Sequence, residues 1–393
     1  MNVYWYWPFA KPEELSLCDA VVRSGVRLTV HTLPRSARSA PATFLHLPTL
    51  PEISGRYRSA SPLRVISRAL TYWRRHRARR RAITDIDPDI VHVFFVNRYT
   101  DGVFGLGGLR HERTILNVHD LRPHDTRTAL LDDWLLRRAY RRAGKIVVHH
   151  EALAQRLRRD LPPDRDVITI PHPVFFQGSR SSPANRRELR LLFFGTLRRN
   201  KGIKVLLEAA RILENETSIA IHVAGHGDPD LERLVRRAAD ERPNVTAAVG
   251  WQDFEQKSDA FAAAAIIVLP YTEFSSQSGV LHDAYGFGRP VLGTDVGALG
   301  DTIRADGTGW VVPPADAQAL ARKILEIRER PLLSEDALAA VERVRSTRNV
   351  EVIADRLLGV YREMLQPSAS PAEGSADGRR PRSRISSAGS RRT

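Results

Sequence analysis

Apolar and polar positions along the first 170 residues predict a domain in which strands and helices alternate. Short apolar runs with little alternation are typical of strands that are buried on both faces, as in parallel sheets covered by helices. The expected strands are residues 2–6, 27–31, 90–96, 114–118, 145–149 and 167–170. The helices expected among them include residues 13–23, 63–82 and 129–142.

The same alternation returns after a polar segment at residues 177–185, which is rich in Ser, Gly and Pro and is expected to be an interdomain linker. The strands expected in this half are residues 191–194, 219–224, 245–249, 266–269, 290–294 and 309–312. The expected helices are residues 203–213, 230–241, 254–264, 279–287 and 317–329. Two such doubly wound domains in series place a cleft between them, with the ligand at the strand carboxyl ends of the second domain.

The charge of the chain suggests two classes of partner. Its 393 residues include 60 Lys and Arg against 45 Asp and Glu, a formal net charge of +15. This excess excludes an acidic solvating protein and suggests nucleic acid or an anionic membrane. The excess is local, because residues 64–81 hold eight Arg and no acid, and residues 367–393 hold six Arg against two acids.

The basic helix expected from Leu63 has an apolar face. Its apolar face would hold Leu63, Ile66, Leu70 and Trp73, with Arg64, Arg68 and Arg75 opposite. Beyond Arg74 the arginines occur on all sides, so we expect that end of the helix to stay out of the core. A solvated helix end is one interpretation. We favour docking on anionic lipid, to which each cation contributes about 1 kcal/mol.

Cysteine usage and hydropathy indicate where the protein works. The single Cys18 excludes an internal disulfide and fits a reducing compartment. We find no signal peptide and no apolar run of the roughly 18 to 20 residues that a spanning helix needs. We therefore expect a cytoplasmic protein that attaches to the inner face of the membrane only peripherally.

Two segments of the second half carry candidate phosphate chemistry. A buried strand ends at Gly195, and Lys201 stands at the start of the next helix, where helix amides and an ammonium group both favour an anion. A solvated lysine before an ordinary helix fits that segment equally well. In the second segment, the stretch Ser276, Gln277, Ser278 and Gly279 supplies small residues at a helix N-terminus, where free N–H groups can cradle a pyrophosphate.

Asp283 follows one turn into that same helix, where its carboxylate could accept ribose hydroxyls. An ordinary first-turn acid, favoured by the helix dipole, is the alternative.

Taken in order, these motifs resemble the family 4 glycosyltransferases. The residues that carry the resemblance are Gly195-x-Leu197-x-x-x-Lys201-Gly202, Val223-Ala224-Gly225-His226-Gly227, Gly288-Arg289-Pro290-Val291 and the segment from Gly307 to Asp316. Residues 114–120 and 170–174 resemble the family more weakly. The resemblance implies an α/β fold of the GT-B type, in which two Rossmann-like domains face a cleft. The nucleotide sugar is then held mainly by the second domain and the acceptor mainly by the first.

On this resemblance we expect an N-terminal domain at residues 1–176, a linker at 177–185 and a C-terminal domain at 186–349. A C-terminal helix at residues 350–366 is expected to cross back to the first domain. Residues 367–393, rich in Ser, Gly, Pro, Ala and Arg, are expected to be a disordered basic tail.

The resemblance also implies roles on the donor side. Lys201 matches the lysine that meets the donor phosphates, and Asp283 matches the acid that holds the ribose. The family arginine falls on Thr196, so its contact is missing or comes from Arg198 or Arg199. The expected donor-binding residues are Gly195, Thr196, Arg198, Lys201, Ser276, Gln277, Ser278, Gly279 and Asp283.

The family's first acid falls on Ser275, with Glu273 two positions upstream. Glu273 could substitute for it if the loop is rearranged. The loop Gln277-Ser278-Gly279 resembles a subset of the family that lacks the usual Glu-Gly-Phe-Gly, and this departure leaves the donor sugar open.

On the acceptor side, His119 follows a buried strand at the edge that faces the expected cleft. A histidine there can donate to a sugar hydroxyl or a phosphate, and the matching family histidine lies beside the transferred sugar. A capping or core histidine is the alternative. Where the family has a Gly-rich loop, this chain has Trp7-Pro8-Phe9-Ala10-Lys11-Pro12, whose aromatic rings form either an acceptor platform or part of the core.

We therefore expect a glycosyltransferase that uses a UDP- or GDP-sugar and a glycan or lipid-linked acceptor in cell-surface polysaccharide or glycoconjugate synthesis. The catalytic candidates are His119, Lys201 and Glu273. The resemblance implies retention of configuration. We expect no cofactor and no metal, because no Asp-x-Asp clamp stands in a strand-end loop and Lys201 with the helix amides can stabilise the leaving diphosphate.

Other functions remain possible at this point. The rival classes are a basic protein that binds nucleic acid or membrane on a catalytically impaired GT-B scaffold, a nucleotide-sugar epimerase and a phosphorylase. The Arg-rich segments lack a zinc finger, a single-strand-binding signature and interleaved aromatic residues, which argues against nucleic acid.

Overall fold

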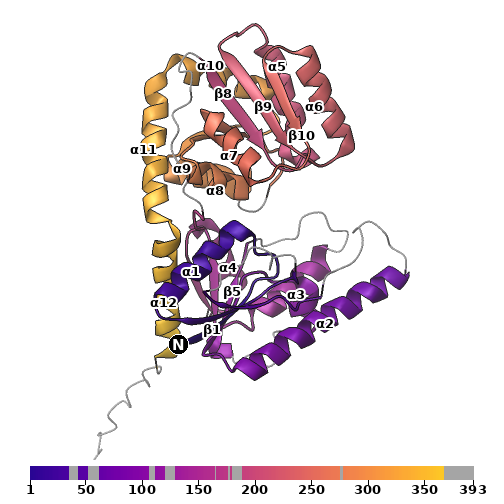
Figure 1. Cartoon of the computed structure of the whole chain (residues 1–393), viewed down its shortest axis with the longest axis vertical. Helices are drawn as coiled ribbons and strands as arrows, with labels where there is room; N and C mark the ends of the chain where they lie inside the picture. The colour runs from indigo at the N-terminus through magenta and orange to yellow at the C-terminus, as the bar shows by residue number, and fades with distance from the viewer. Residues whose placement is uncertain are drawn as a thin grey trace, which may run out of the picture.

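The computed structural model of the chain consists of two α/β lobes joined along one side (Figure 1). It describes residues 1–34, 43–51, 62–105, 111–119, 129–163, 165–175, 178, 188–274 and 278–366. The linker expected at residues 177–185, apart from Gly178, and the tail expected at 367–393 lie outside the described residues. The expected fold class, two parallel-sheet Rossmann-like domains, is confirmed.

The N-terminal lobe is a parallel seven-stranded sheet in the order β3-β2-β1-β4-β5-β6-β7. Its strands are β1 (Asn2–Tyr6), β2 (Arg27–His31), β3 (Leu45–Leu47), β4 (Ile90–Val93), β5 (Thr114–Asn117), β6 (Lys145–Val148) and β7 (Asp166–Thr169). Its helices are α1 (Ser16–Arg23), α2 (Pro62–Ile86), α3 (Ala129–Tyr140) and α4 (Glu151–Asp160). A 3₁₀ turn, Pro12–Leu15, leads into α1, and a π-helical turn, Arg98–Val103, follows β4.

The C-terminal lobe is a parallel six-stranded sheet in the order β10-β9-β8-β11-β12-β13. Its strands are β8 (Leu189–Phe194), β9 (Ile219–Gly225), β10 (Val245–Val249), β11 (Ile266–Leu269), β12 (Val291–Thr294) and β13 (Gly309–Val312). The helices from this lobe onward are α5 (Ile203–Ile212), α6 (Pro229–Glu241), α7 (Phe254–Ala263), α8 (Gly279–Gly286), α9 (Gly297–Asp306), α10 (Ala317–Glu329), α11 (Pro331–Thr347) and α12 (Val350–Leu365).

The last helix crosses back to the first lobe, as expected. Figure 1 shows α11 and α12 as one edge that runs past both lobes, with α12 beside α1 and the N-terminus. Ile353, Leu357 and Tyr361 are buried in the same core as Val3 and Trp5. Residues from both ends of the chain therefore form one hydrophobic core.

A hydrogen-bond network fixes α12 in this position. The Trp5 indole Nε1 donates to the Tyr361 hydroxyl at 3.0 Å, and that hydroxyl is hydrogen-bonded to His92 Nδ1 at 2.6 Å. On the other side of the ring, His92 Nε2 lies 2.9 Å from Asn117 Oδ1. Because all four side chains are buried, each hydrogen bond satisfies a polar group that would otherwise be costly to remove from water.

The expectation that the arginine-rich end of α2 stays out of the core is wrong. Arg75 and Arg79 are only 3% and 1% exposed, and the side chains of Ile66, Leu70 and Trp73 are exposed instead. The helix therefore turns two arginines toward the sheet and much of its apolar face outward.

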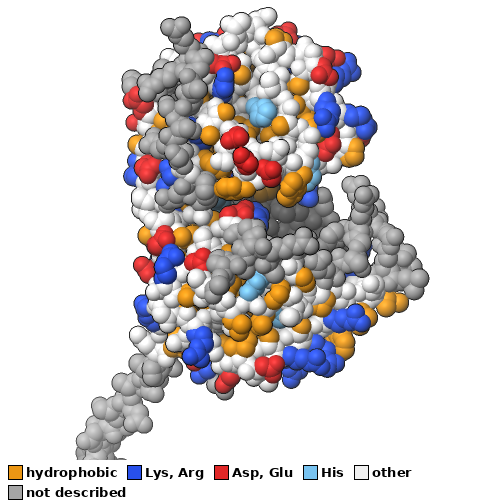
Figure 2. Space-filling view, in the orientation of Figure 1, with side chains coloured by type: hydrophobic (Ala, Val, Ile, Leu, Met, Phe, Trp, Pro, Cys, Tyr) orange, Lys and Arg blue, Asp and Glu red, His pale blue; other side chains and the backbone are white. Residues whose placement is uncertain are grey.

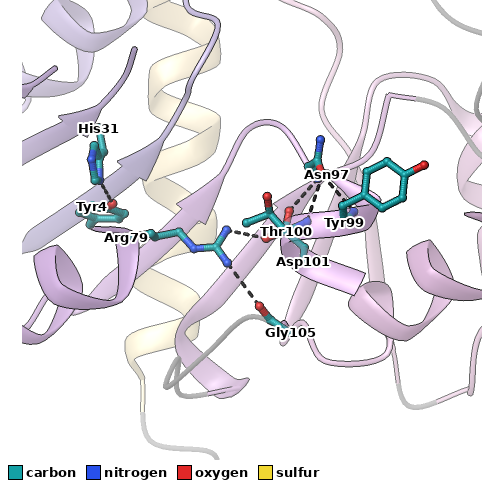
Figure 3. A network of polar contacts seen from close by, with 8 residues as sticks. All are labelled: Tyr4, His31, Arg79, Asn97, Tyr99, Thr100, Asp101 and Gly105. Atoms are coloured by element: carbon teal, nitrogen blue, oxygen red, sulfur yellow. Dashed lines mark hydrogen bonds and ion pairs between the residues drawn. The ribbon is translucent and has the colours of Figure 1, made fainter. Parts of the chain in front are cut away.

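A partner carboxylate explains how Arg79 can be buried (Figure 3). Its guanidinium group lies 2.5 Å from Asp101 in the π-helical turn, and Nη2 donates to the Gly105 carbonyl oxygen. The same group lies 4.8 Å from the centre of the Tyr6 ring, within cation–π distance. Asp101 is itself oriented, because Oδ2 accepts from the Asn97 backbone N–H at 2.7 Å. A buried ion pair of this kind is stable only because hydrogen bonds satisfy its remaining polar atoms.

Candidate active site

The loop that leaves β8 carries the lysine predicted to meet phosphate. Gly195 ends the strand region, and Lys201 lies in a short 3₁₀ turn directly before α5. Gly202 has a φ of 70°, and a Cβ at this position would lie 1.7 Å from the Pro270 carbonyl oxygen. Only glycine permits this approach, so the turn that presents Lys201 packs directly against the end of β11.

Two aromatic rings surround the ammonium group of Lys201. Nζ lies 3.6 Å from the centre of the Tyr271 ring and 4.1 Å from that of Phe274. Burial and the neighbouring charge of Arg198 lower the pKa of Lys201 from 10.5 to about 8. The group is still mostly protonated at pH 7, and it lies where water solvates it poorly. An anion that reaches it would restore the interactions that burial removed.

Tyr271 connects this lysine to the start of α8, and the sequence did not single it out. Its hydroxyl is hydrogen-bonded to Ser278 Oγ at 2.9 Å, and burial raises the pKa of Tyr271 to about 12. Ser278 is 2% exposed and directly precedes α8. A signal for Tyr271 existed, because it stands two residues after a buried strand, at the sheet edge where ligands bind.

The first turn of α8 lies beside the end of β8. A Cβ on Gly195 would lie 3.5 Å from Val280 Cγ2, so these elements are in contact at the predicted donor edge. Gly279 begins the helix and lines a cavity. Ser276 and Gln277, which were predicted to cradle the pyrophosphate, lie outside the described residues.

Asp283 is held by a partner that the sequence did not identify. Its Oδ1 lies 2.7 Å from Lys257 Nζ, which comes from α7, and the two side chains are 27% and 14% exposed. The carboxylate that was predicted to bind the ribose is therefore held in an ion pair between α7 and α8.

The remaining donor-side predictions lie on the same two loops. Glu273 has an exposed side chain, and its carbonyl oxygen accepts from Asn200 Nδ2 at 3.3 Å. Arg198 is exposed and acts on Lys201 electrostatically, while Thr196 is partly buried in the loop that follows β8. Of these residues, Arg198 interacts with Lys201, and the contacts that each would make with a sugar remain predictions.

Across from this edge, the N-terminal lobe contains a cavity of about 290 Å³, which we call the aromatic cavity. Its walls include Trp7, Phe9, Phe94, Phe95, His119 and Phe175. The rings of Trp7 and Phe94 are stacked, with their centres 4.4 Å apart. The aromatic loop after β1 therefore serves as core and cavity wall at once, since Trp7 is 9% exposed and still lines the cavity.

His119 follows the carboxyl end of β5 and lines this cavity. Its Nε2 lies 2.9 Å from the Phe94 carbonyl oxygen, to which it donates a hydrogen bond. That bond fixes the ring orientation. Residues 120–128, which complete the His119-Asp120 motif, lie outside the described residues.

A row of four histidines leads from the aromatic cavity to the C-terminal lobe. The ring centres of His119 and His149 are 5.0 Å apart, those of His149 and His172 are 5.2 Å apart, and those of His172 and His282 are 4.0 Å apart. Burial lowers the pKa of His149 and His172 well below 6.5 and that of His282 to about 3. These three rings are therefore neutral at pH 7. The stacked pair of His172 and His282 joins the two lobes.

A second cavity, of about 50 Å³, lies between the lobes, and we call it the interdomain cavity. Its residues come from the N-terminal lobe (Lys11, Glu13, Glu14, His172) and from the C-terminal lobe (Lys257, Gly279, His282, Asp283). Glu14, His172 and Phe175 line both cavities. Figure 2 shows the recess between the lobes. The predicted acceptor side and donor side thus meet across one cleft.

The described residues hold no group of three histidine, cysteine, aspartate or glutamate side chains arranged to bind a metal ion.

Comparison with known families agrees with this arrangement. Residues 15–176 match the family described as Glycosyltransferase Family 4, and residues 188–330 match the family described as Glycosyl transferases group 1. The two matches together span both lobes and include His119, Lys201 and Asp283.

Among curated proteins, the chain is similar to the phosphatidyl-myo-inositol mannosyltransferase of Mycobacterium tuberculosis. The two are 28% identical over 206 residues, which cover 50% of this chain and 54% of that protein. The chain thus matches about half the length of this curated relative.

Among solved structures, the fold is similar to that of sucrose-phosphate synthase from Thermosynechococcus elongatus, with a TM-score of 0.74 and 18% identity over 93% of this chain and 99% of that one. It is also similar to HepE of Anabaena in complex with UDP, with a TM-score of 0.64 and 14% identity over 92% of this chain and 100% of that one. At these identities the likeness concerns the fold.

Proposed function

From the premise that the chain belongs to the family 4 glycosyltransferases of the GT-B fold, we propose a specific reaction for it. It transfers a hexosyl group from a UDP- or GDP-sugar to a glycan or lipid-linked acceptor, with retention of configuration and without a metal ion. The observation that carries the proposal is the poorly solvated ammonium group of Lys201 at the carboxyl edge of the C-terminal sheet.

Lys201 supplies the positive charge that this reaction needs. When the bond from the anomeric carbon to the diphosphate breaks, negative charge grows on the leaving phosphate oxygens. A preorganised cation in a site shielded from water stabilises that charge more strongly than it would in water. The N-terminus of α8, beside Gly195 and preceded by Ser278, adds helix amides on the same side.

Asp283 and His119 are proposed to orient the two ends of the donor. Asp283 exchanges part of its ion pair with Lys257 for ribose hydroxyls. His119 lies on the opposite wall of the cleft, in the aromatic cavity, where it meets the transferred sugar. The acceptor enters through the aromatic cavity, because this cavity is larger than the interdomain cavity.

The donor test is a panel of nucleotide sugars. UDP-glucose, UDP-galactose and GDP-mannose are incubated with the protein, and nucleotide release is measured with and without EDTA. UDP and GDP are compared by thermal shift. Stabilisation by one of the two nucleotides, together with EDTA-resistant turnover, is expected. If duplex DNA stabilises the protein and neither UDP nor GDP does, the proposal is refuted in favour of a basic nucleic-acid-binding protein.

We further propose that the enzyme works on the inner surface of the membrane and docks through α2. Its exposed residues Ile66, Leu70, Trp73, Arg77 and Arg81 follow each other at helical spacing and form one stripe. Apolar side chains occupy the first half of the stripe and cationic ones the second, which suits an anionic lipid interface. Figure 2 shows hydrophobic and basic side chains along this edge of the N-terminal lobe.

A cation–π contact links the two halves of the stripe, because the Arg77 guanidinium carbon lies 4.8 Å from the Trp73 ring centre. Among the described residues no helix has the length and hydropathy to cross a bilayer. The proposed attachment therefore uses a surface of the folded domain.

Vesicle co-sedimentation tests the docking surface. Binding to vesicles with one third phosphatidylglycerol is expected to exceed binding to pure phosphatidylcholine and to weaken with salt. Trp73→Ser and Arg77→Glu should each reduce it several-fold, whereas Arg322→Glu, an exposed site on α10, should reduce it far less. Equal binding to both vesicle types would refute the docking surface and leave the transfer reaction untouched.

A further inference from the structure

Glu14 occupies a place in the cleft that no role assigned so far explains. It lies in the 3₁₀ turn between the aromatic loop and α1, and it lines both the aromatic cavity and the interdomain cavity. Its neighbour Glu13 lines the interdomain cavity and is not among the residues that line the aromatic one. The carboxylate of Glu14 therefore marks the point where the acceptor side opens toward the donor side.

Local contacts hold this carboxylate in place. Oε2 accepts from the Lys11 backbone N–H at 2.9 Å, which fixes the side chain across the turn. Oε1 lies 3.8 Å from Lys11 Nζ, which is beyond hydrogen-bond distance. The side chain is only 17% exposed. One oxygen is thus used for orientation, and the other has capacity to accept a hydrogen bond from a ligand.

The surroundings of Glu14 disfavour a permanent negative charge. Burial, with Glu13 and Asp283 adding like charge, raises the pKa of Glu14 from 4.5 to about 7, although Lys11 opposes the rise. The neutral His172 ring lines the same two cavities. Carboxylates that are poorly solvated in a cleft are frequent at functional sites.

We propose that Glu14 is the residue that receives the sugar acceptor, with Oε1 accepting a hydrogen bond from an acceptor hydroxyl while the sugar ring packs against the aromatic walls. This inference rests on the proposed transfer function and names its acceptor contact. The cavity of about 290 Å³ is just below the range of about 300–1,000 Å³ that is typical of small-molecule pockets, and it suits one sugar ring. Aromatic faces with one oriented polar group give such a site its affinity and its orientation.

The proposal sets the sign of a pH effect. The ionised carboxylate accepts the hydrogen bond, and protonation removes much of this capacity. Acceptor affinity should therefore be present above about pH 7 and fall as the pH drops through that value. Burial keeps the pKa of Glu14 high, and the like charges of Glu13 and Asp283 add to the effect. The other charged or titratable groups that line its two cavities are Lys11, His119, His149, His172, Lys257 and His282.

Octyl β-glucoside and octyl α-mannoside serve as acceptor probes, titrated by calorimetry below their micelle concentrations between pH 5.5 and 8.5. Glu14→Gln keeps the shape and the acceptor for the Lys11 N–H. For whichever of the two glycosides the wild-type protein binds, this variant is expected to have an affinity at least tenfold lower at pH 8. The pH dependence of that affinity is expected to be lost. Glu13→Gln, the adjacent acid, is expected to leave the affinity at pH 8 unchanged and to keep the pH dependence, with its midpoint moved to lower pH because one like charge is removed.

Two results would overturn the role of Glu14. One is the absence of any glycoside binding to the wild-type protein, and the other is equal behaviour of the Glu14→Gln and Glu13→Gln variants. Thermal shift with UDP or GDP distinguishes a failure of the Glu14 proposal from a failure of the proposed transfer function. Glu14 is not among the residues proposed to contact the nucleotide, so its substitution should leave the shift unchanged. A Glu14→Gln variant that still binds nucleotide normally and unfolds at the wild-type temperature also excludes simple misfolding.

Discussion

Replacing Lys201 by methionine should strongly reduce sugar transfer and at the same time stabilise the fold. In the free protein the ammonium group lies between Tyr271 and Phe274, and its pKa falls from 10.5 to about 8. At 1.36 kcal/mol for each pKa unit, this fall corresponds to about 3 kcal/mol by which the site disfavours the charge. Methionine has a similar length, packs well against aromatic rings and carries no charge.

The two effects of this substitution have opposite signs. Removing the charge recovers part of the 3 kcal/mol, and losing the cation–π attraction costs about 1–2 kcal/mol. The free energy of unfolding should therefore rise, by at most about 1–2 kcal/mol. One cation aimed at developing charge contributes about 2.7–4 kcal/mol to the transition state, so kcat/KM for the nucleotide sugar should fall about 100- to 1,000-fold.

Nucleotide release from the active donor measures the loss, and urea denaturation measures the gain. The control is Lys204→Met, an exposed lysine in the first turn of α5, which should change neither quantity appreciably. A Lys201→Met variant within tenfold of wild-type kcat/KM would refute the assigned role. A less stable variant would refute the reasoning from desolvation.

Three further predictions concern the charge and the framework. Because Lys201 titrates near pH 8 in the free protein, calorimetric affinity for the active nucleotide should fall as the pH rises through about 8, and Lys201→Met should remove that dependence. Arg79→Met leaves Asp101 buried without its partner and should lower the free energy of unfolding by about 3–5 kcal/mol in urea, whereas adding Asp101→Asn should restore part of it. Tyr361→Phe removes the shared hydroxyl between Trp5 and α12 and should cost about 1–3 kcal/mol by the same measurement.

Hydrophobic patterning predicted the sheets well because the strands are buried on both faces. The bounds of β10, β11 and β13 agree with the expected residues 245–249, 266–269 and 309–312. The patterning missed β3, which has only three residues with a histidine at its centre. It also missed α9 and α11, and in α9 two glycines and an aspartate within the first five residues obscure the helical period.

The orientation of α2 could not be inferred from its own sequence. The partner that allows Arg79 to be buried, Asp101, lies 22 residues away in a π-helical turn. Helical periodicity carries no information about such a pair. The general rule that arginine stays solvated therefore gave the wrong face.

Some residues of the candidate site could likewise be placed from the sequence, and others could not. Lys201 and Asp283 could be placed at one edge because the carboxyl ends of parallel strands meet there. Tyr271, Lys257 and Glu14 depend on contacts between loops or between lobes, and local sequence does not show them. The edge that holds the predicted donor residues could thus be inferred from topology, whereas their partners became visible only in three dimensions.

The shared core of β1 and α12 has a consequence for biosynthesis. Trp5 and Tyr361 are separated by 356 positions, so the first strand leaves the ribosome long before the helix that covers it exists. At about 5–20 residues per second, this delay amounts to roughly 20–70 s. During that time the apolar surface around Val3 and Trp5 lacks its cover, while the intervening C-terminal lobe is still being made. The nascent chain should therefore complete its first domain last, and a chaperone that binds early has this surface to protect.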